Sequence, residues 1–250
     1  MATATNPPAD PTPASVTDPL SLLASGTVSL QGQFTLGSNY TFLVTLTSPA
    51  GTLQAVYKPS RGEQPLWDFP PATLALREVA AFRLSRLLGL GLVPPTVHRA
   101  DGPYGQGSYQ LFIPYDPNYH YFSLNPQDQP GLAAVAFFDV LCNNADRKGS
   151  HILYSQDTHH LYAIDHGLCF HEEDKLRTVI WDFAGQPVPP ALLQPLSALL
   201  GQPTLLHAEL SPYLSASELA ALTLRAQTLL ANPLFPHPPQ DKRAFPYPPL

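Results

Sequence analysis

The feature that most constrains this 250-residue sequence is a change of hydrophobic period halfway along it. Residues 26–46 alternate apolar and polar side chains on both sides of a Gly-Ser-Asn turn at 37–39, which is typical of a β-hairpin. Residues 52–59 continue as a third strand, whereas residues 131–143 are apolar on nearly every face, as in a buried helix. This order predicts a chain in which a strand-rich lobe precedes a helical lobe.

The remaining periodic segments complete these two lobes. The spacing predicts a helix at about 73–89 and two more strands at 93–98 and 108–115. Two later helices are expected near 190–200 and 215–230, each introduced by Pro or Ser. We therefore expect a two-lobed α+β fold, with an antiparallel N-terminal sheet plus one helix and a mainly helical C-terminal lobe.

Proline, with 30 residues, is dense at the two ends of the chain and sets the expected boundaries. Residues 1–18 are rich in Pro, Ala and Thr and are predicted to form a disordered lead. Residues 19–116 are predicted to form the N-terminal lobe and residues 117–232 the C-terminal lobe. Residues 233–250 form a second proline-rich segment, which is treated as a tail.

Two interpretations of the tail at 233–250 remain open from the sequence. Its prolines favour an extended polyproline conformation. Its aromatic residues Phe235, Phe245 and Tyr247 would alternatively let it strap across the surface of the folded chain.

Charge argues against two classes of partner. The net charge is −6, and no run of Lys and Arg is present, so the basic surface typical of nucleic-acid binders is not expected. The same absence weighs against docking on an anionic membrane. Because no apolar run approaches ~18 residues, we expect no membrane-spanning helix and no integral membrane association.

Cysteine usage and the first residues predict a cytoplasmic protein. Cys142 and Cys169 each lie in an apolar stretch, and two isolated cysteines make neither a zinc cluster nor a disulfide framework. We interpret both as reduced core residues. The N-terminal sequence has no basic region followed by an apolar one, so no signal peptide is expected.

Two aspartates are the strongest candidates for chemistry. Asp146 lies in a densely polar loop at 143–151 that directly follows the predicted buried helix. Asp165 ends an apolar strand and is followed by Gly167 after one residue, an arrangement that fixes a carboxylate and lets the chain turn away. Each aspartate alone is equally well explained by a turn or a helix cap. The two together favour a catalytic and metal-binding function.

A lysine and a glutamate upstream form a second candidate pair. Lys58 ends the third strand, and Glu78 lies on a helical stripe of otherwise apolar or small residues. A carboxylate on an inward face requires a cation, and Lys58 is a candidate for it. The alternatives are an exposed strand-end lysine and a surface glutamate paired with Arg77 or Arg86.

These residues match the parts that phosphoryl transfer from ATP requires. A flexible turn covers the phosphates, a lysine held by a carboxylate neutralises them, one aspartate orients the acceptor, and a second holds Mg²⁺. The turn candidates are Ser38 and Asn39. Lys58 and Glu78 would bind ATP.

The motifs NADRKGSHILYS (144–155) and LYAIDHG (161–167) resemble the catalytic and metal-binding segments of the phosphatidylinositol 3-/4-kinase-like superfamily. The closest likeness is to type II phosphatidylinositol 4-kinases and a group of uncharacterised bacterial relatives. The resemblance implies a protein-kinase-like fold, in which residues 19–116 are the nucleotide-binding lobe and residues 117–232 the catalytic lobe. It implies that Asp146 is the catalytic-loop aspartate and that Asp165 binds the metal. It also implies that Lys58 and Glu78 are the ATP lysine and the helix glutamate, and by order it places Phe112 and Ile113 beside adenine.

One departure from this family pattern concerns the second metal ligand. The family usually has Asn there, and this chain has His151. Imidazole is a softer ligand than Mg²⁺ prefers. The substitution therefore indicates a preference for Mn²⁺, a cation held mainly by Asp165, or a loss of activity.

Three functional hypotheses follow from these residues. The first is an ATP-dependent phosphotransferase in which Asp146 orients an acceptor hydroxyl while Arg147 and Lys148 neutralise phosphate charge; the acceptor is an unidentified protein side chain or a small soluble molecule. The second is a nucleotide-binding pseudokinase, which His151 favours. The third keeps the fold but transfers AMP.

Overall fold

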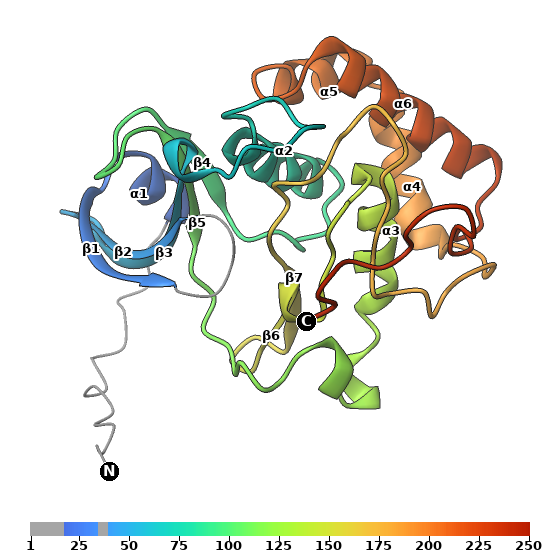
Figure 1. Ribbon diagram of the computed structural model, residues 1–250, viewed down its shortest axis with the longest axis horizontal. Helices are drawn as coiled ribbons and strands as arrows, with labels where there is room; N and C mark the ends of the chain where they lie inside the picture. Colours follow the sequence, from blue (N-terminus) through green and yellow to red (C-terminus); the bar gives the residue numbers. More distant parts are fainter. Residues whose placement is uncertain (1–17, 35–39) are drawn as a thin grey trace.

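The computed structural model describes residues 18–34 and 40–250 of the chain (Figure 1). The predicted turn at 37–39, with Ser38 and Asn39, lies outside these described residues. Within them, no helix combines the length and the apolar character that a membrane crossing requires.

The N-terminal lobe is built on a five-stranded antiparallel sheet, as the alternating sequence pattern predicts. The strand order is β1-β2-β3-β5-β4, so that β3, which ends in Lys58 and Pro59, is central. The strands are β1 (Thr27–Phe34), β2 (Thr41–Ser48), β3 (Gly51–Pro59), β4 (Thr96–Arg99) and β5 (Gly107–Leu111).

Two helices accompany this sheet, where the sequence predicted one. The expected helix is α2 (Leu74–Leu87). The additional helix, α1 (Pro19–Ser25), buries Leu22 and Leu23 against the sheet, and the Asp18 side chain caps it by accepting a hydrogen bond from the Leu20 N–H at 3.1 Å. Seven residues are too few to show a helical period, which explains why sequence reasoning missed it.

The C-terminal lobe is mainly helical, with one small hairpin. Sequence reasoning missed α5, a short helix that begins at a proline. The elements are α3 (Leu132–Cys142), β6 (Ile152–Ser155), β7 (His160–Ala163), α4 (Pro190–Leu200), α5 (Pro203–Leu210) and α6 (Ala216–Ala231). Short 3₁₀ turns are η1 (Ser60–Gly62), η2 (Tyr121–Ser123), η3 (Pro126–Asp128) and η4 (Gly149–His151).

Two apolar clusters form the core. The boundary between them does not coincide with the point at which the chain passes from the N-terminal to the C-terminal lobe. The first joins α1 to the inner face of the sheet, with Val44 and Tyr57 fully buried. The second contains the C-terminal helices and also Ala80, Ala81 and Leu84 of α2. Helix α2 is therefore packed with the C-terminal lobe as well as with the sheet.

The two cysteines belong to this second cluster. Cys142 and Cys169 are free, buried thiols with their Sγ atoms 3.6 Å apart. Burial raises the pKa of the Cys169 thiol well above its usual value.

The tail straps across the C-terminal lobe, but not through all three expected anchors. Phe235 is buried and packs on Phe183, with 5.4 Å between the ring centroids. Phe245 and Tyr247 remain exposed. Figure 1 shows this red segment returning to end beside β6 and β7.

A buried ion pair ties α2 to α6. The Arg77 guanidinium contacts the Glu218 carboxylate, donates to the Cys169 carbonyl at 2.6 Å, and lies over the Phe69 ring. Arg77 is therefore not a partner of Glu78, which was one of the sequence alternatives.

Substitution of Arg77 tests this tie. Arg77→Ala leaves the Glu218 carboxylate without its cation, so we expect the free energy of unfolding to fall by about 3–5 kcal/mol in urea titrations. The matched control is Arg86→Ala, because the pair between Arg86 and Glu209 is solvent-exposed and contributes about 0–1 kcal/mol. Equal losses in the two variants would contradict the assignment.

Candidate active site

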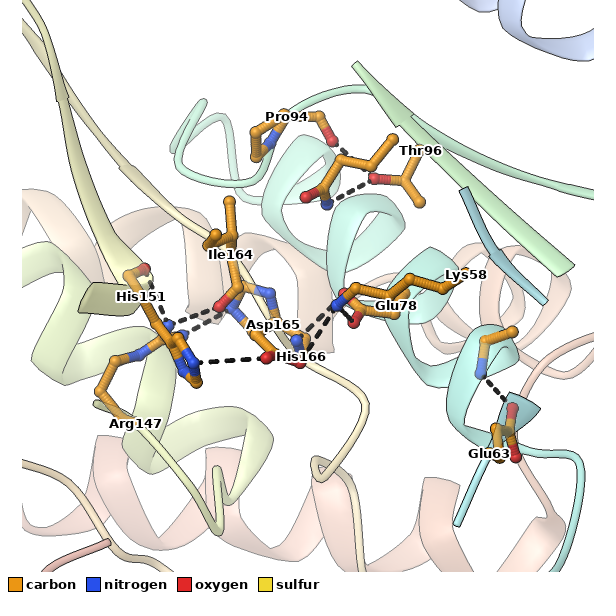
Figure 2. Close-up of polar contacts among 12 residues, drawn as sticks. Lys58, Glu63, Glu78, Pro94, Thr96, Arg147, His151, Ile164, Asp165 and His166 are labelled. Atoms are coloured by element: carbon orange, nitrogen blue, oxygen red, sulfur yellow. Dashed lines mark hydrogen bonds and ion pairs between the residues drawn. The ribbon is translucent and has the colours of Figure 1, made fainter. Parts of the chain in front are cut away.

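Lys58 lies at the centre of a charged cluster between the lobes. Its Nζ is 2.5 Å from Glu78 Oε1 and 3.1 Å from Asp165 Oδ1 (Figure 2). Burial alone would lower the pKa of Lys58, but the charges of Asp165 and Glu78 outweigh burial and hold it above its usual value. The ammonium group is thus permanently charged and is fixed by two carboxylates.

Glu78 connects this lysine to the loop that carries Asp165. Its second oxygen, Oε2, accepts a hydrogen bond from the His166 N–H at 3.0 Å. The side chain is buried on α2, so both of its oxygens are committed to defined partners. The sequence allowed Glu78 to be either an inward-facing partner of Lys58 or a surface residue. In the structure it faces inward and pairs with Lys58.

Asp165 follows β7 by two residues and has a left-handed backbone, with φ of 59°. This conformation is costly for most residues and is concentrated at functional sites. The Asp165 side chain is 47% exposed, and its Oδ2 lies 3.3 Å from His151 Nε2. Burial would raise its pKa, but Lys58 and His151 more than offset that and keep the pKa of the carboxyl below its usual range.

Asp146 lies in the loop after α3, and its carboxylate is not the group that caps the backbone of this loop. The Asx turn that the sequence allowed here is made by Asn144, whose Oδ1 accepts from the Asp146 N–H at 2.9 Å. Burial raises the pKa of Asp146 to about 6, the charge of Asp165 adds to the rise, and Lys148, 3.6 Å away, opposes it. A carboxylate with this pKa is suited to accept a proton near neutral pH.

Arg147 does not face the cleft, which corrects the expectation that it neutralises phosphate. It is fully buried, and its Nε lies 3.0 Å from Asp139 Oδ2 on α3. Adjacent residues of an extended segment point to opposite sides, so Asp146 faces the cavity and Arg147 the interior. Its guanidinium also donates to the carbonyls of His151 at 3.2 Å and Ile164 at 2.6 Å.

Asp139 is the functional partner that sequence reasoning missed. It is completely buried in α3, where Asn144 and Arg147 both bond to its carboxylate. A detectable signal was present, because Asp139 is the one charged residue in an otherwise apolar helix. A lone buried carboxylate requires a cation nearby in the fold.

His151 completes the cluster as a neutral imidazole. Burial and the charges of Arg147, Lys58 and Lys148 together lower its pKa to about 4, although the carboxylate of Asp165 acts in the opposite direction. A neutral ring keeps a lone pair on nitrogen for a metal ion. Its Nδ1 is buried without a hydrogen-bond partner.

A cavity of about 910 Å³ brings these groups together, a volume in the range of nucleotide-sized ligand pockets. Its lining includes Lys58, Glu78, Asp146, Lys148, His151 and Asp165. It also includes groups that the sequence did not indicate as site residues, namely Tyr40, Thr41, Tyr119, His120 and Tyr247.

The adenine candidates fit less well than the charged residues. Phe112 and Ile113 follow β5 directly, but they are not among the residues that line the cavity. The Phe112 N–H already donates to the Gln54 carbonyl at 3.0 Å, so it is not free for a base. The cavity instead meets the connection between the lobes at Tyr115 and the residues after it.

The donor set fits a divalent cation that is shared with a ligand. Within residues 18–34 and 40–250, no three His, Cys, Asp or Glu side chains form a ready-made metal cluster. Asp165 and His151 supply one oxygen and one nitrogen donor, which leaves the remaining positions for phosphate and water oxygens. The nitrogen donor favours Mn²⁺ over Mg²⁺.

Comparison with solved structures supports the fold assignment. The Golgi casein kinase superposes with a TM-score of 0.55 at 19% identity, covering 85% of this chain and 74% of that chain, and it has also been solved with Mn/ADP bound. The Helicobacter pylori proinflammatory kinase CtkA gives a TM-score of 0.53 at 13% identity, covering 85% and 94%. At these identities the likeness shows a kinase-like fold.

Sequence comparison identifies the family of the chain as well as its fold. Protein Rv2133c of Mycobacterium tuberculosis is 40% identical over 269 residues, covering 92% of this chain and 95% of that protein. The family described as phosphatidylinositol 3- and 4-kinase matches residues 74–214, which include Glu78, Asp146, His151 and Asp165. Since this match spans more than half of the sequence, the chain belongs to the phosphatidylinositol 3- and 4-kinase family.

Proposed function

We propose that this protein is an ATP-dependent phosphotransferase that acts on a hydroxyl group. The observation that carries the proposal is the position of the Lys58 ammonium between Glu78 and Asp165, in the same cavity as Asp146. This arrangement provides the charged lysine, the metal-binding carboxylate and the proton acceptor that phosphoryl transfer requires.

Each residue has a distinct role in this proposal. Lys58, fixed by Glu78, binds the phosphates of ATP, and Lys148 adds a second positive charge beside Asp146. Asp146 orients the acceptor hydroxyl and takes its proton. Asp165 and His151 hold a divalent cation, Mg²⁺ or Mn²⁺, which supplies charge neutralisation of the phosphates when bound.

The lining of the cavity supports a requirement for that cation. Carboxylates outnumber ammonium groups among the lining residues, which also include Glu63 and Asp116. A polyanionic nucleotide would be repelled from such a lining unless a divalent cation entered with it.

The acceptor in this proposal is a protein side chain or a small soluble molecule. A phosphoinositide is not favoured, because the chain carries a net charge of −6 and no basic run. Two alternatives retain the nucleotide site. A pseudokinase is favoured by His151 in place of the family's Asn, and transfer of AMP would show as an adenylate on the target.

Loss of the metal-binding carboxylate tests the proposal directly. Asp165→Asn keeps the side-chain shape and the pair between Lys58 and Glu78, so the fold should persist while ADP formation from ATP falls by at least about a hundredfold. An Asp157→Asn control, in the exposed turn between β6 and β7, should retain activity. Binding is measured separately: ATP with Mn²⁺ at a hundred times its Kd should stabilise the fold by about 2.7 kcal/mol. ADP formation that survives in Asp165→Asn would reject the assignment.

The pH dependence tests Asp146. Below pH 6 its carboxyl group is protonated and cannot take a proton, so kcat/KM should fall on the acid side with an apparent pKa of about 6. Asp146→Asn should lower the rate by about 10²–10⁴-fold and remove this acid limb. Lys148→Met removes a charge that lowers the pKa of Asp146, so the limb should move to higher pH. An acid limb that persists in Asp146→Asn would assign it to another group.

Metal preference tests His151. We expect ADP formation to be faster with Mn²⁺ than with Mg²⁺, because imidazole nitrogen is the softer ligand. His151→Asn should shift this preference toward Mg²⁺ by about tenfold in the ratio of kcat/KM values. His160→Asn, at a histidine that contacts the Gly91 carbonyl outside this cavity, serves as the control. An unchanged ratio in His151→Asn would exclude a contact between this residue and the cation.

A further inference from the structure

The last segment of the chain lies along one side of the candidate active site. Residues Tyr247, Pro248 and Leu250 line the same cavity as Asp146 and Asp165. The red trace in Figure 1 shows the segment ending beside the β6–β7 hairpin, and β6 directly follows the loop that carries Asp146. Part of the space around the catalytic aspartate is thus already occupied by polypeptide.

Main-chain hydrogen bonds hold this segment in place. The Thr178 N–H donates to the Ala244 carbonyl at 3.1 Å, and the Gly149 N–H donates to the Pro249 carbonyl at 2.8 Å. The Trp181 Nε1–H also donates to the Ala244 carbonyl, at 3.2 Å. Main-chain hydrogen bonds of this kind are also the way in which an extended peptide adds to the exposed edge of a β-sheet.

The edge that the segment covers is part of the catalytic loop's own support. Arg147 pairs with Thr178 in a short parallel bridge, where the Arg147 N–H donates to the Arg177 carbonyl at 3.0 Å and the Val179 N–H to the Arg147 carbonyl at 3.1 Å. The Thr178 N–H therefore points away from the catalytic loop, toward Ala244. The surface that the segment covers, called here the tail-binding edge, extends from the Thr178 N–H to the Gly149 N–H, and Gly149 follows Asp146 by three residues.

The segment is held loosely enough to be displaced. Phe245, Tyr247 and Leu250 are 50%, 78% and 52% exposed. Its charged anchor, Lys242 Nζ to Asp174 Oδ2 at 2.7 Å, is a surface ion pair, a type that adds little stability. Pro246 is the buried residue within Ala244–Leu250.

We propose that the tail-binding edge between Gly149 and Thr178 is the acceptor site, that it binds an extended polypeptide, and that Ala244–Leu250 is its resident occupant. The proposal rests on the phosphotransferase function above and specifies its acceptor. The two main-chain donors are matched by carbonyls of residues 244 and 249, a repeat that a polypeptide offers and a small metabolite does not. An acceptor polypeptide displaces the resident segment before its hydroxyl reaches Asp146.

The test uses the full chain with changes confined to residues 242–246, so that the tail-binding edge itself is unchanged. Lys242→Ala removes the ion pair, and Pro246→Gly increases the freedom of the released segment and removes its buried ring. The probe is a fluorescein-labelled peptide with the sequence of residues 241–250. We expect it to bind the double variant about fivefold more tightly than the wild type in fluorescence polarisation. A peptide of scrambled sequence and an Arg86→Ala variant are the controls.

Amide hydrogen exchange locates the binding. The Gly149 and Thr178 amides should exchange faster in the double variant than in the wild type and slow again when the peptide is added. ATP hydrolysis, with water as the acceptor, should rise in the double variant and fall back when the peptide is added. If the double variant does not fold, Lys242→Ala alone should show the same changes at about twofold.

Three outcomes would overturn the inference. They are no peptide binding to the folded variant, binding that leaves the Gly149 and Thr178 amides unprotected, and, where the wild type forms ADP, binding that leaves the rate of ATP hydrolysis unchanged. Peptide binding and amide exchange need no nucleotide, so a failure of the phosphotransferase function is recognised separately, by the absence of ADP formation in all variants.

Discussion

The guanidinium of Arg147, buried against Asp139, holds together the two loops that carry the candidate catalytic residues. It bonds to the carbonyl of His151 on the catalytic loop and to that of Ile164 directly before Asp165. A buried ion pair is weak evidence for net stability, but removing one partner leaves an uncompensated charge in the core. The relative positions of Asp146, His151 and Asp165 therefore depend on a residue that never contacts the cavity.

The cluster around Lys58 complements this support electrostatically. One ammonium group lies between two carboxylates from different elements, so α2, β3 and the loop after β7 are joined at a single point. The second oxygen of Glu78 accepts a hydrogen bond from the His166 N–H, and this bond fixes the backbone next to Asp165. Such a cluster keeps the lysine charged in a site from which water is partly excluded, where its attraction for phosphate is stronger than in bulk water.

Much of this arrangement could be predicted from the sequence, and the remainder could not for definable reasons. The alternating strands and the apolar helix predicted the two-lobed α+β fold. Alternation reflects a strand buried on one face, and an apolar sequence without a polar stripe reflects a helix buried on all sides. Helices α1 and α5 are too short to show a period. The inward face of Arg147 was missed because a polar loop does not reveal which of its side chains turn to the interior.

The same limit applies at the edges of the site. Lys58 and Glu78 were paired from their place on a strand end and on an inward stripe, and the structure brings them within hydrogen-bond distance. The residues beside adenine could not be predicted in the same way, because a strand-end residue such as Phe112 carries no local sign of whether its backbone groups are free to bond a base. The tail offered two interpretations because prolines define an extended chain but not the surface on which it lies.

Helix α2 carries Arg77 and Glu78 side by side, and the two point to different parts of the molecule. Arg77 is anchored to α6, while Ala80, Ala81 and Leu84 lie in the helical lobe's apolar cluster. The sheet and α1 have an apolar cluster of their own. Lys58 belongs to the sheet, whereas Glu78 belongs to a helix that packs both on β4 and β5 and on the helical lobe. Because their ion pair joins the sheet to that helix, any displacement of β3 relative to α2 would separate the two side chains, so the distance between Lys58 and Glu78 reports the relative position of the lobes.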